Sequence, residues 1–138
     1  MKKIFSVLLI VLLFGCNAPK TIVAPEPLFK IIKSSQEQGG TFKFYETITE
    51  KNEFAMLTSD PDLKELITAS DIATCNFALI NLGGKPESGY SINVALVQET
   101  ADKIILKITE IAPAMDNDEG SNPLFIIKVN SKKTLELQ

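Results

Sequence analysis

The chain contains no histidine, no arginine and no tryptophan, and only two cysteines among its 138 residues. Without histidine, neither a Ser-His-Asp triad nor a Cys-His pair can be assembled, which excludes the commonest nucleophilic enzymes. Most zinc sites use cysteine or histidine ligands, so a zinc centre is not expected either. The positive charge comes entirely from lysine, and the formal net charge is −3. A mildly acidic chain of this kind is a poor partner for nucleic acid or for anionic lipid headgroups.

The first residues differ sharply from the rest of the chain. Lys2 and Lys3 precede the apolar run IFSVLLIVLLF, which is too short to span a bilayer comfortably as a permanent helix. The run ends in LFGC, with Gly15 directly before Cys16, and this matches the bacterial lipobox. We therefore expect residues 1–15 to be a lipoprotein signal peptide and Cys16 to carry diacylglycerol and an amide-linked acyl chain. The alternative is a secretory signal followed by an ordinary cysteine.

Two acyl modifications on Cys16 would give stable attachment to a membrane of the bacterial cell envelope. The following stretch, NAPKTIVAPEPL, contains three prolines, so we expect residues 16–28 to form a lipidated, semi-extended tether. Asn17 is not the aspartate that commonly retains lipoproteins in the inner membrane, which favours the outer membrane. Whether the protein faces the periplasm or the cell surface is left open. The folded domain is expected over residues 29–138.

Cys75 would be the one free thiol of the mature chain, so no intramolecular disulfide is expected. It lies in the apolar run IATCNFALINL, where a lone cysteine is most often a small buried hydrophobe. A reactive thiol would need a cationic or histidine neighbour, and none is visible in the sequence. We predict that Cys75 belongs to the core.

Strand patterns dominate the remaining chain. Apolar and polar residues alternate in KIILKITEI, where Ile104, Leu106 and Ile108 share one face, and Phe42 and Phe44 alternate with polar neighbours in TFKFYETIT. Short turn signals separate these runs. Strands are expected at residues 29–35, 41–49, 73–82, 90–97, 103–111, 123–129 and 134–138.

Two short helices are expected between the second and third strands. TEKNEFAMLTSD offers Thr49 as the N-cap, with Phe54 and Leu57 at helical spacing. DPDLKELITAS offers a second helix over residues 60–70, with Asp60 as the cap and Pro61 at its first position. The pattern predicts an α+β, mainly antiparallel β domain. It would form a small sheet or sandwich-like domain with one or two short helices between the early and late strands.

The stretch NLGGKPESGYSINV, residues 81–94, is the first candidate for a functional site. It fits neither G-x-x-x-x-G-K-[ST] nor G-x-G-x-x-G, and no helix follows that could bind a phosphate. A Ser88–Lys85 dyad is formally possible, because a desolvated lysine can act as a base. A lysine in an exposed Gly-Pro turn should be fully hydrated, so we expect no catalytic residues here.

The same residues are well suited to a rigid corner of a sheet. Pro86 fixes its own φ, and the glycines at positions 83, 84 and 89 can supply positive φ where the chain reverses. Tyr90 would pack its ring in the core, with its hydroxyl tied to a backbone group of the turn. Such a corner could present Lys85, Glu87 and Ser88 to a partner.

MDNDEGSN, residues 115–122, is the second candidate. Asp116, Asp118 and Glu119 could gather oxygen ligands around a calcium ion. The spacing departs from the EF-hand pattern, because the glycine arrives one residue early and no glutamate closes the loop. We interpret the segment as a solvated acidic hairpin tip, with cation binding left open, and expect no metal and no cofactor elsewhere.

The stretch from Ala73 to Val129 resembles the C-terminal domain of the protease complex subunit PrcB family. The resemblance rests on FALINLGGKPESGYSINVALV, then KIILKITEIAP, then NPLFIIKV. Glu87 and Ser88 depart from the Thr-Gly that is usual in the family. The positions that match the family motif are Gly83, Lys85, Pro86, Gly89, Tyr90, Ile92 and Val94.

This resemblance implies a lipid-anchored, non-catalytic accessory module that binds another exported protein. In the family's namesake the partner belongs to a subtilisin-like surface protease complex. KPESGY is also similar to the Pro-x-x-Gly-aromatic loop of chagasin-type cysteine-protease inhibitors, which lies between strands of an immunoglobulin-like sandwich. That similarity implies an alternative function, protease inhibition through the loop Pro86–Tyr90. The Arg-Pro-Trp element of the inhibitors is absent from this chain, which has neither arginine nor tryptophan.

Overall fold

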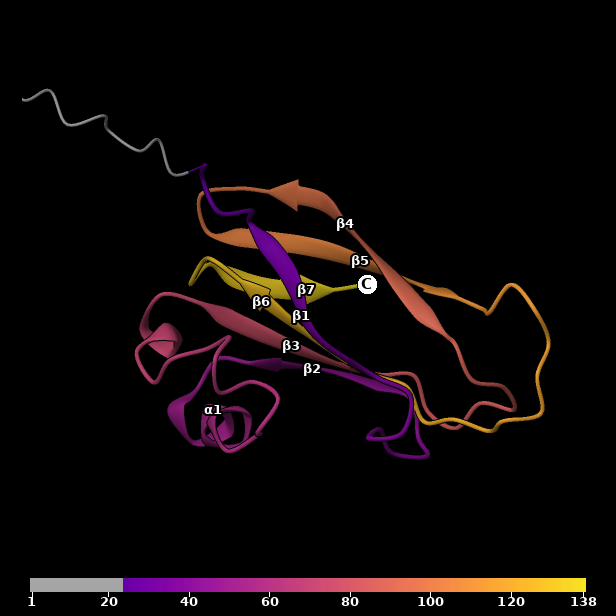
Figure 1. Cartoon of the computed structure of the whole chain (residues 1–138). Helices are drawn as coiled ribbons and strands as arrows, with labels where there is room; N and C mark the ends of the chain where they lie inside the picture. Colours follow the sequence, from indigo (N-terminus) through magenta and orange to yellow (C-terminus); the bar gives the residue numbers. More distant parts are fainter. Residues whose placement is uncertain (1–23) are drawn as a thin grey trace, which may run out of the picture.

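A computed structural model describes residues 24–138 (Figure 1). The predicted signal peptide, the lipidation at Cys16 and most of the predicted tether lie outside these residues. No helix within the described part of the chain is both long and apolar enough to cross a bilayer.

Within residues 24–138, seven strands form two sheets. The elements are β1 (Phe29–Ser35), β2 (Phe44–Ile48), α1 (Lys51–Thr58), the 3₁₀ helix η1 (Asp71–Ala73), β3 (Asn76–Asn81), β4 (Ser91–Glu99), β5 (Lys103–Ile111), β6 (Leu124–Val129) and β7 (Thr134–Leu137). Strands β1, β6, β3 and β2 lie side by side, in that order, in a four-stranded antiparallel sheet. Strands β4, β5 and β7 form a three-stranded sheet, in which β4 and β5 are antiparallel and β5 and β7 are parallel. The prediction of a mainly antiparallel α+β domain is confirmed.

The main core lies between the two sheets. Alternate residues of β3 point to opposite faces, so Ala78 and Ile80 join this core while Phe77 points away from it. The predicted buried face of β5 is confirmed. The buried members of this cluster are Ala78, Ile80, Leu82, Ile92, Ile104, Leu106, Ile108, Phe125, Ile127, Val129 and Leu135.

A second cluster covers the other face of the four-stranded sheet. Helix α1 places Phe54 on Phe77, with ring centroids 4.9 Å apart, and buries Leu57 beside them. The predicted short helix is therefore confirmed, although Glu50 and not Thr49 occupies its N-cap position. Cys75 is 5% exposed within this cluster, as predicted.

The second predicted helix, over residues 60–70, does not form; this segment is a series of turns. An ion pair with a residue far away in the sequence holds this segment in place. The Lys33 side chain on β1 is buried under the segment and bonds both Asp60 and Asp62. Burial disfavours the charge of Lys33, but its hydrogen bonds to the two carboxylates outweigh this and raise its pKa. Burial of Leu63 and Ile67 in the second cluster fixes the rest of the segment.

We predict that Asp60→Asn destabilises the domain, because a buried lysine then loses its nearer charged partner. The expected loss is about 1–3 kcal/mol, below the range for a fully broken buried pair because Asp62 remains. Urea unfolding of the variant would measure it. Glu136→Gln, in the exposed pair with Lys103, is the matched control and should leave the midpoint nearly unchanged. Equal midpoint shifts for the two variants would contradict a structural role for the Lys33 pair.

Candidate functional site

Three connecting segments gather at one end of the sandwich. Residues 36–43 join β1 to β2, residues 83–90 lie in the connection from β3 to β4, and residues 112–122 lie in the connection from β5 to β6. Figure 1 shows all three at the end opposite to that where the chain enters the domain. We call these three segments the loop end. The GGKPESGYS stretch singled out in the sequence is its central segment.

Two side-chain amides from the neighbouring segments hold the backbone of the central segment. Gln36 accepts a hydrogen bond from the N–H of Gly89 (2.9 Å) and donates one to the carbonyl of Tyr90 (2.8 Å). Asn117 accepts from the N–H of Ser88 (2.9 Å) and donates to its carbonyl (2.8 Å). Each amide therefore satisfies one backbone donor and one backbone acceptor, as another strand would. Neither amide was predicted, since neither residue belongs to a motif of the central segment.

Backbone contacts add to this bracing. Lys85 and Ser121 exchange two backbone hydrogen bonds, of 2.8 and 3.0 Å, in an isolated antiparallel bridge. The Ser121 hydroxyl donates to the carbonyl of Glu87. On the other side, the N–H of Gly84 donates to the carbonyl of Thr41 at 3.0 Å. The central segment is thus tied to both neighbouring segments.

The glycine predictions hold at two of three positions. Gly83 has φ of 77° and Gly89 has φ of 100°, both in the region that favours glycine, whereas Gly84 does not have positive φ. A Cβ atom on Gly83 would also lie 2.9 Å from the backbone nitrogen of Lys43, so close approach of the two segments requires glycine there.

The Lys85 side chain is less exposed to solvent than the sequence suggested. Its side chain is only 17% exposed and bonds Glu110, and its ammonium lies 5.1 Å from the centroid of the Tyr90 ring. Lys43 bonds the second oxygen of Glu110 at 3.2 Å. Within the described residues no hydrogen bond joins Lys85 to Ser88, so the dyad considered from the sequence is not assembled. The expectation that Lys85 is fully hydrated is wrong.

Glu110 is the hub of this ion-pair network. Burial of its carboxylate disfavours the charge, but hydrogen bonds from Lys85 and Lys43 outweigh this and hold its pKa below the ordinary value. Both lysines of the loop end are thereby engaged by a carboxylate at the end of β5.

Tyr90 packs against the main core, as predicted. The expected hydrogen bond from its hydroxyl to the turn is absent among the described residues. The turn is held at the Tyr90 carbonyl instead, by Gln36. Glu87 and Ser88 are half-buried, and their contacts with the other segments are made by backbone atoms.

A buried amide fixes the first segment. Asn81, at the end of β3, is fully buried and donates to the carbonyls of Gly40 (3.2 Å) and Phe42 (2.6 Å), while its oxygen accepts from the N–H of Gly40 (3.1 Å). The backbone of Phe42 is thus held in place, yet its side chain is 82% exposed. The alternation expected for residues 41–49 is present, but Tyr45 occupies the core face and Phe44 is 46% exposed.

The acidic tip lies in the third segment, with Asp116, Asp118 and Glu119 all exposed. Asn117 turns away from these carboxylates and binds Ser88. No group of three or more metal-ligating side chains comes together within residues 24–138.

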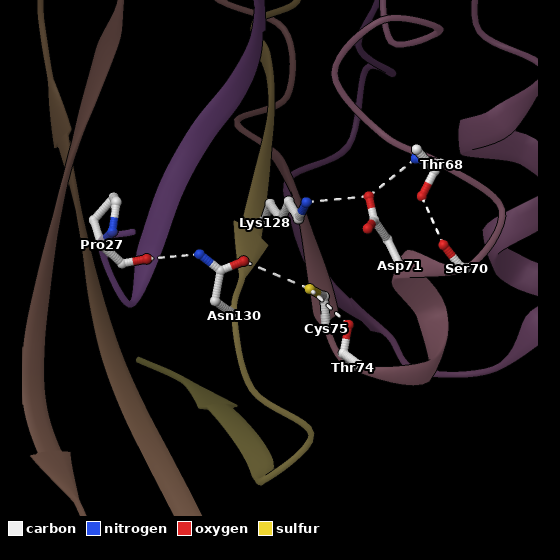
Figure 2. Close-up of polar contacts among 8 residues, drawn as sticks. All are labelled: Pro27, Thr68, Ser70, Asp71, Thr74, Cys75, Lys128 and Asn130. Carbon is white, nitrogen blue, oxygen red and sulfur yellow. Dashed lines mark hydrogen bonds and ion pairs between the residues drawn. The ribbon is translucent and has the colours of Figure 1, made fainter. Parts of the chain in front are cut away.

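At the end opposite to the loop end, Asn130 binds the first part of the described chain (Figure 2). Asn130 donates its side-chain N–H to the carbonyl of Pro27 (2.7 Å), and its backbone N–H to the carbonyl of Leu28 (2.7 Å). The Cys75 thiol lies 3.5 Å from the Asn130 side-chain oxygen. Lys128 and Asp71 form an ion pair nearby, at 3.1 Å. Asn130 therefore holds the start of the described chain, while the Lys128–Asp71 pair joins β6 to η1.

No protein-family model, curated protein or solved structure matches the chain. The loop end is therefore interpreted from its own geometry.

We predict that Tyr90→Ala lowers the free energy of unfolding by about 2–4 kcal/mol, because a half-buried aromatic ring is removed from the core. Glu87→Ala should change it by no more than about 0.5 kcal/mol, since the Glu87 contact is made by its carbonyl. Thermal unfolding of both variants measures the difference. Similar melting temperatures for the two would mean that the central segment does not depend on Tyr90.

The depressed pKa of Glu110 predicts a pH dependence. A native pKa below the unfolded value means that the ionised group stabilises the fold above the unfolded value, about pH 4.5, and that this contribution is lost as the pH falls through the native pKa. Glu110→Gln should therefore unfold at lower urea at neutral pH and lose less stability between about pH 5 and pH 3. Glu65→Gln, an exposed carboxylate on the turn segment, is the control. The same acid profile for Glu110→Gln and the wild type would refute the ion-pair account.

Proposed function

We propose that the protein is a non-catalytic, lipid-anchored accessory module of the bacterial cell envelope that uses the loop end to bind another exported protein. The lipobox at Cys16 supports the anchor, with the outer membrane as the favoured location. The similarity of residues 73–129 to the PrcB family supports the accessory role and makes a subtilisin-like protease one candidate partner.

The observation that carries this proposal is the bracing of the loop end. Asn81 uses its side-chain amide to fix the backbone of the first segment, and Gln36 and Asn117 use theirs to fix the backbone of the central segment. A segment that is already ordered loses little conformational entropy when a partner binds, so more of the contact energy appears as affinity. Exposed side chains on a fixed backbone, such as Phe42, are what such a surface presents.

The placement of the anchor fits the same role. The chain enters the domain at the end held by Asn130, and the loop end lies at the other end (Figure 1). Between Cys16 and Pro27 the chain can span at most about 40 Å, at about 3.3–3.6 Å per residue. An anchored domain can thus hold its loop end away from the membrane surface.

The polar contacts of the loop end also support a non-catalytic role. A serine nucleophile needs a base within hydrogen-bond reach, and Lys85, the lysine nearest in sequence to Ser88, is occupied by Glu110. Ser88 is bonded through its backbone to Asn117, which positions the loop and supplies no base.

A pull-down from detergent-solubilised membranes tests the proposal. The wild-type chain should recover one exported protein in stoichiometric amount, and Phe42→Ala should reduce its recovery several-fold, because a large exposed side chain is lost from the binding surface. Met56→Ala, which removes an exposed side chain from α1, is the matched control and should have no effect. Repeated recovery of the chain alone would count against any accessory role.

Protease inhibition through Pro86–Tyr90 is the second candidate. It is favoured by one observation, the fixed backbone of Ser88 and Gly89, because an inhibitory loop must keep its shape in a protease cleft. Titration of the protein against papain-like and subtilisin-like proteases tests it. The absence of inhibition at micromolar concentrations would remove this candidate.

A further inference from the structure

We propose that the loop end recognises a cationic protein surface: a partner whose lysine or arginine side chains surround an apolar pocket. This inference rests on the proposed function and adds the chemistry of the partner. It is drawn from the distribution of charge at the loop end and from two exposed apolar side chains.

The negative charge of the domain is concentrated at the loop end. Residues 24–138 contain eleven lysines and seventeen carboxylates, a formal excess of six negative charges. The loop end together with Glu110 contains two of these lysines and six of these carboxylates, so four of the six excess charges lie there. Of the six carboxylates of the loop end and Glu110, those that form no ion pair among the described residues are Glu37, Glu87, Asp116, Asp118 and Glu119.

The two lysines of the loop end share one carboxylate, so their network with Glu110 carries one net positive charge against the five carboxylates without an ion pair. Lys43 and Lys85 both bond Glu110, and Lys85 is mostly buried in doing so. Glu110 uses its two oxygens for the two lysines. The exposed charge that a partner meets is therefore negative, and complementary positive charge would speed association and select the partner.

Two apolar side chains are exposed on the segments that carry these carboxylates. Phe42 is 82% exposed and Met115 is 80% exposed, more than any other large hydrophobic residue of the described chain. They lie on the two segments that flank and brace residues 83–90. An aromatic side chain on a fixed backbone suits insertion into a pocket, and a methionine adapts to irregular apolar surfaces. The combination points to an apolar pocket with a positive rim.

A bound cation explains the acidic tip less well. Calcium needs six or more oxygen ligands that converge, and no cluster of three such side chains forms within residues 24–138. The Asn117 oxygen, a further oxygen of this segment, accepts from the N–H groups of Ser88 and Glu119. An anionic membrane surface is disfavoured by charge repulsion.

Site-specific photo-crosslinking of the full-length chain in its native host tests the inference. The photoreactive residue p-benzoylphenylalanine replaces Phe42 or Met115, with Lys64 and Gln98, exposed residues on other segments, as control positions. We expect one protein adduct from positions 42 and 115 and none from the controls. The partner peptide mapped by mass spectrometry should carry net positive charge.

The charge requirement is tested by neutralisation. The triple variant Asp116→Asn, Asp118→Asn, Glu119→Gln should lower the adduct yield by at least about threefold, because charges at an interface rim govern encounter. The triple variant Glu46→Gln, Glu65→Gln, Asp102→Asn removes as much charge elsewhere and should leave the yield unchanged. In detergent extracts, raising NaCl from about 50 to about 500 mM should weaken the wild-type complex.

The outcomes separate the two proposals. Adducts only at the control positions, or adducts at 42 and 115 that are indifferent to neutralisation and salt, would overturn this inference and leave an accessory role standing. Loss of the adduct with a calcium chelator would overturn it in favour of a cation-dependent contact. The absence of adducts at all four positions would remove this inference and the proposed function together.

Discussion

The structure depends on the burial of β3 on both faces. Phe77 faces the cluster beneath α1, while Ala78 and Ile80 face the cluster between the sheets, so this one strand joins both cores. Its pairing with β2 on one side and β6 on the other leaves its last residue, Asn81, with no exposure to solvent. A buried amide must find hydrogen-bond partners, and those of Asn81 are backbone groups of residues 40–42. A buried residue of the sheet therefore fixes the backbone of the first segment of the loop end.

The rest of the loop end is held by side-chain amides and not by the regular pairing of strands. Gln36 and Asn117 come from different connecting segments and meet consecutive residues of a third one. Each supplies a donor and an acceptor at fixed spacing, which is how an amide can replace a missing strand. The result is a surface whose backbone is hydrogen-bonded at Ser88, Gly89 and Tyr90 and on which the Phe42 and Met115 side chains remain exposed. Such an arrangement is consistent with the proposed role in recognition.

The parts that the sequence predicted are those set by local periodicity. The bounds of β1 and β5 follow from apolar runs and alternation, and Gly89 follows from the need to reverse the chain after Pro86. The helix predicted over residues 60–70 does not form, although its N-cap and proline signals are typical of a helix start. Local sequence signals are therefore not sufficient to predict this segment. An ion pair with Lys33, 27 residues before Asp60, overrides them.

The candidate site shows the same limit. The sequence indicated the central segment and its rigid-corner character, yet Gln36 and Asn117 carry no local signal for their contacts, which join residues 53 and 29 positions apart. The sequence also did not predict the contact between Lys85 and Glu110, because the pairing of β4 with β5 brings these two residues together. Long-range polar contacts of this kind become visible only in three dimensions.

The central claim is that the loop end is ordered before any partner arrives. Native-state hydrogen exchange of the free protein tests this most directly, read at the amides of Ser88 and Gly89. Because Asn117 and Gln36 accept from these amides, they should exchange at least about a hundredfold more slowly than in an unstructured peptide. Gln36→Ala should release Gly89 alone. Exchange of both amides at unstructured rates in the wild-type protein would contradict the account.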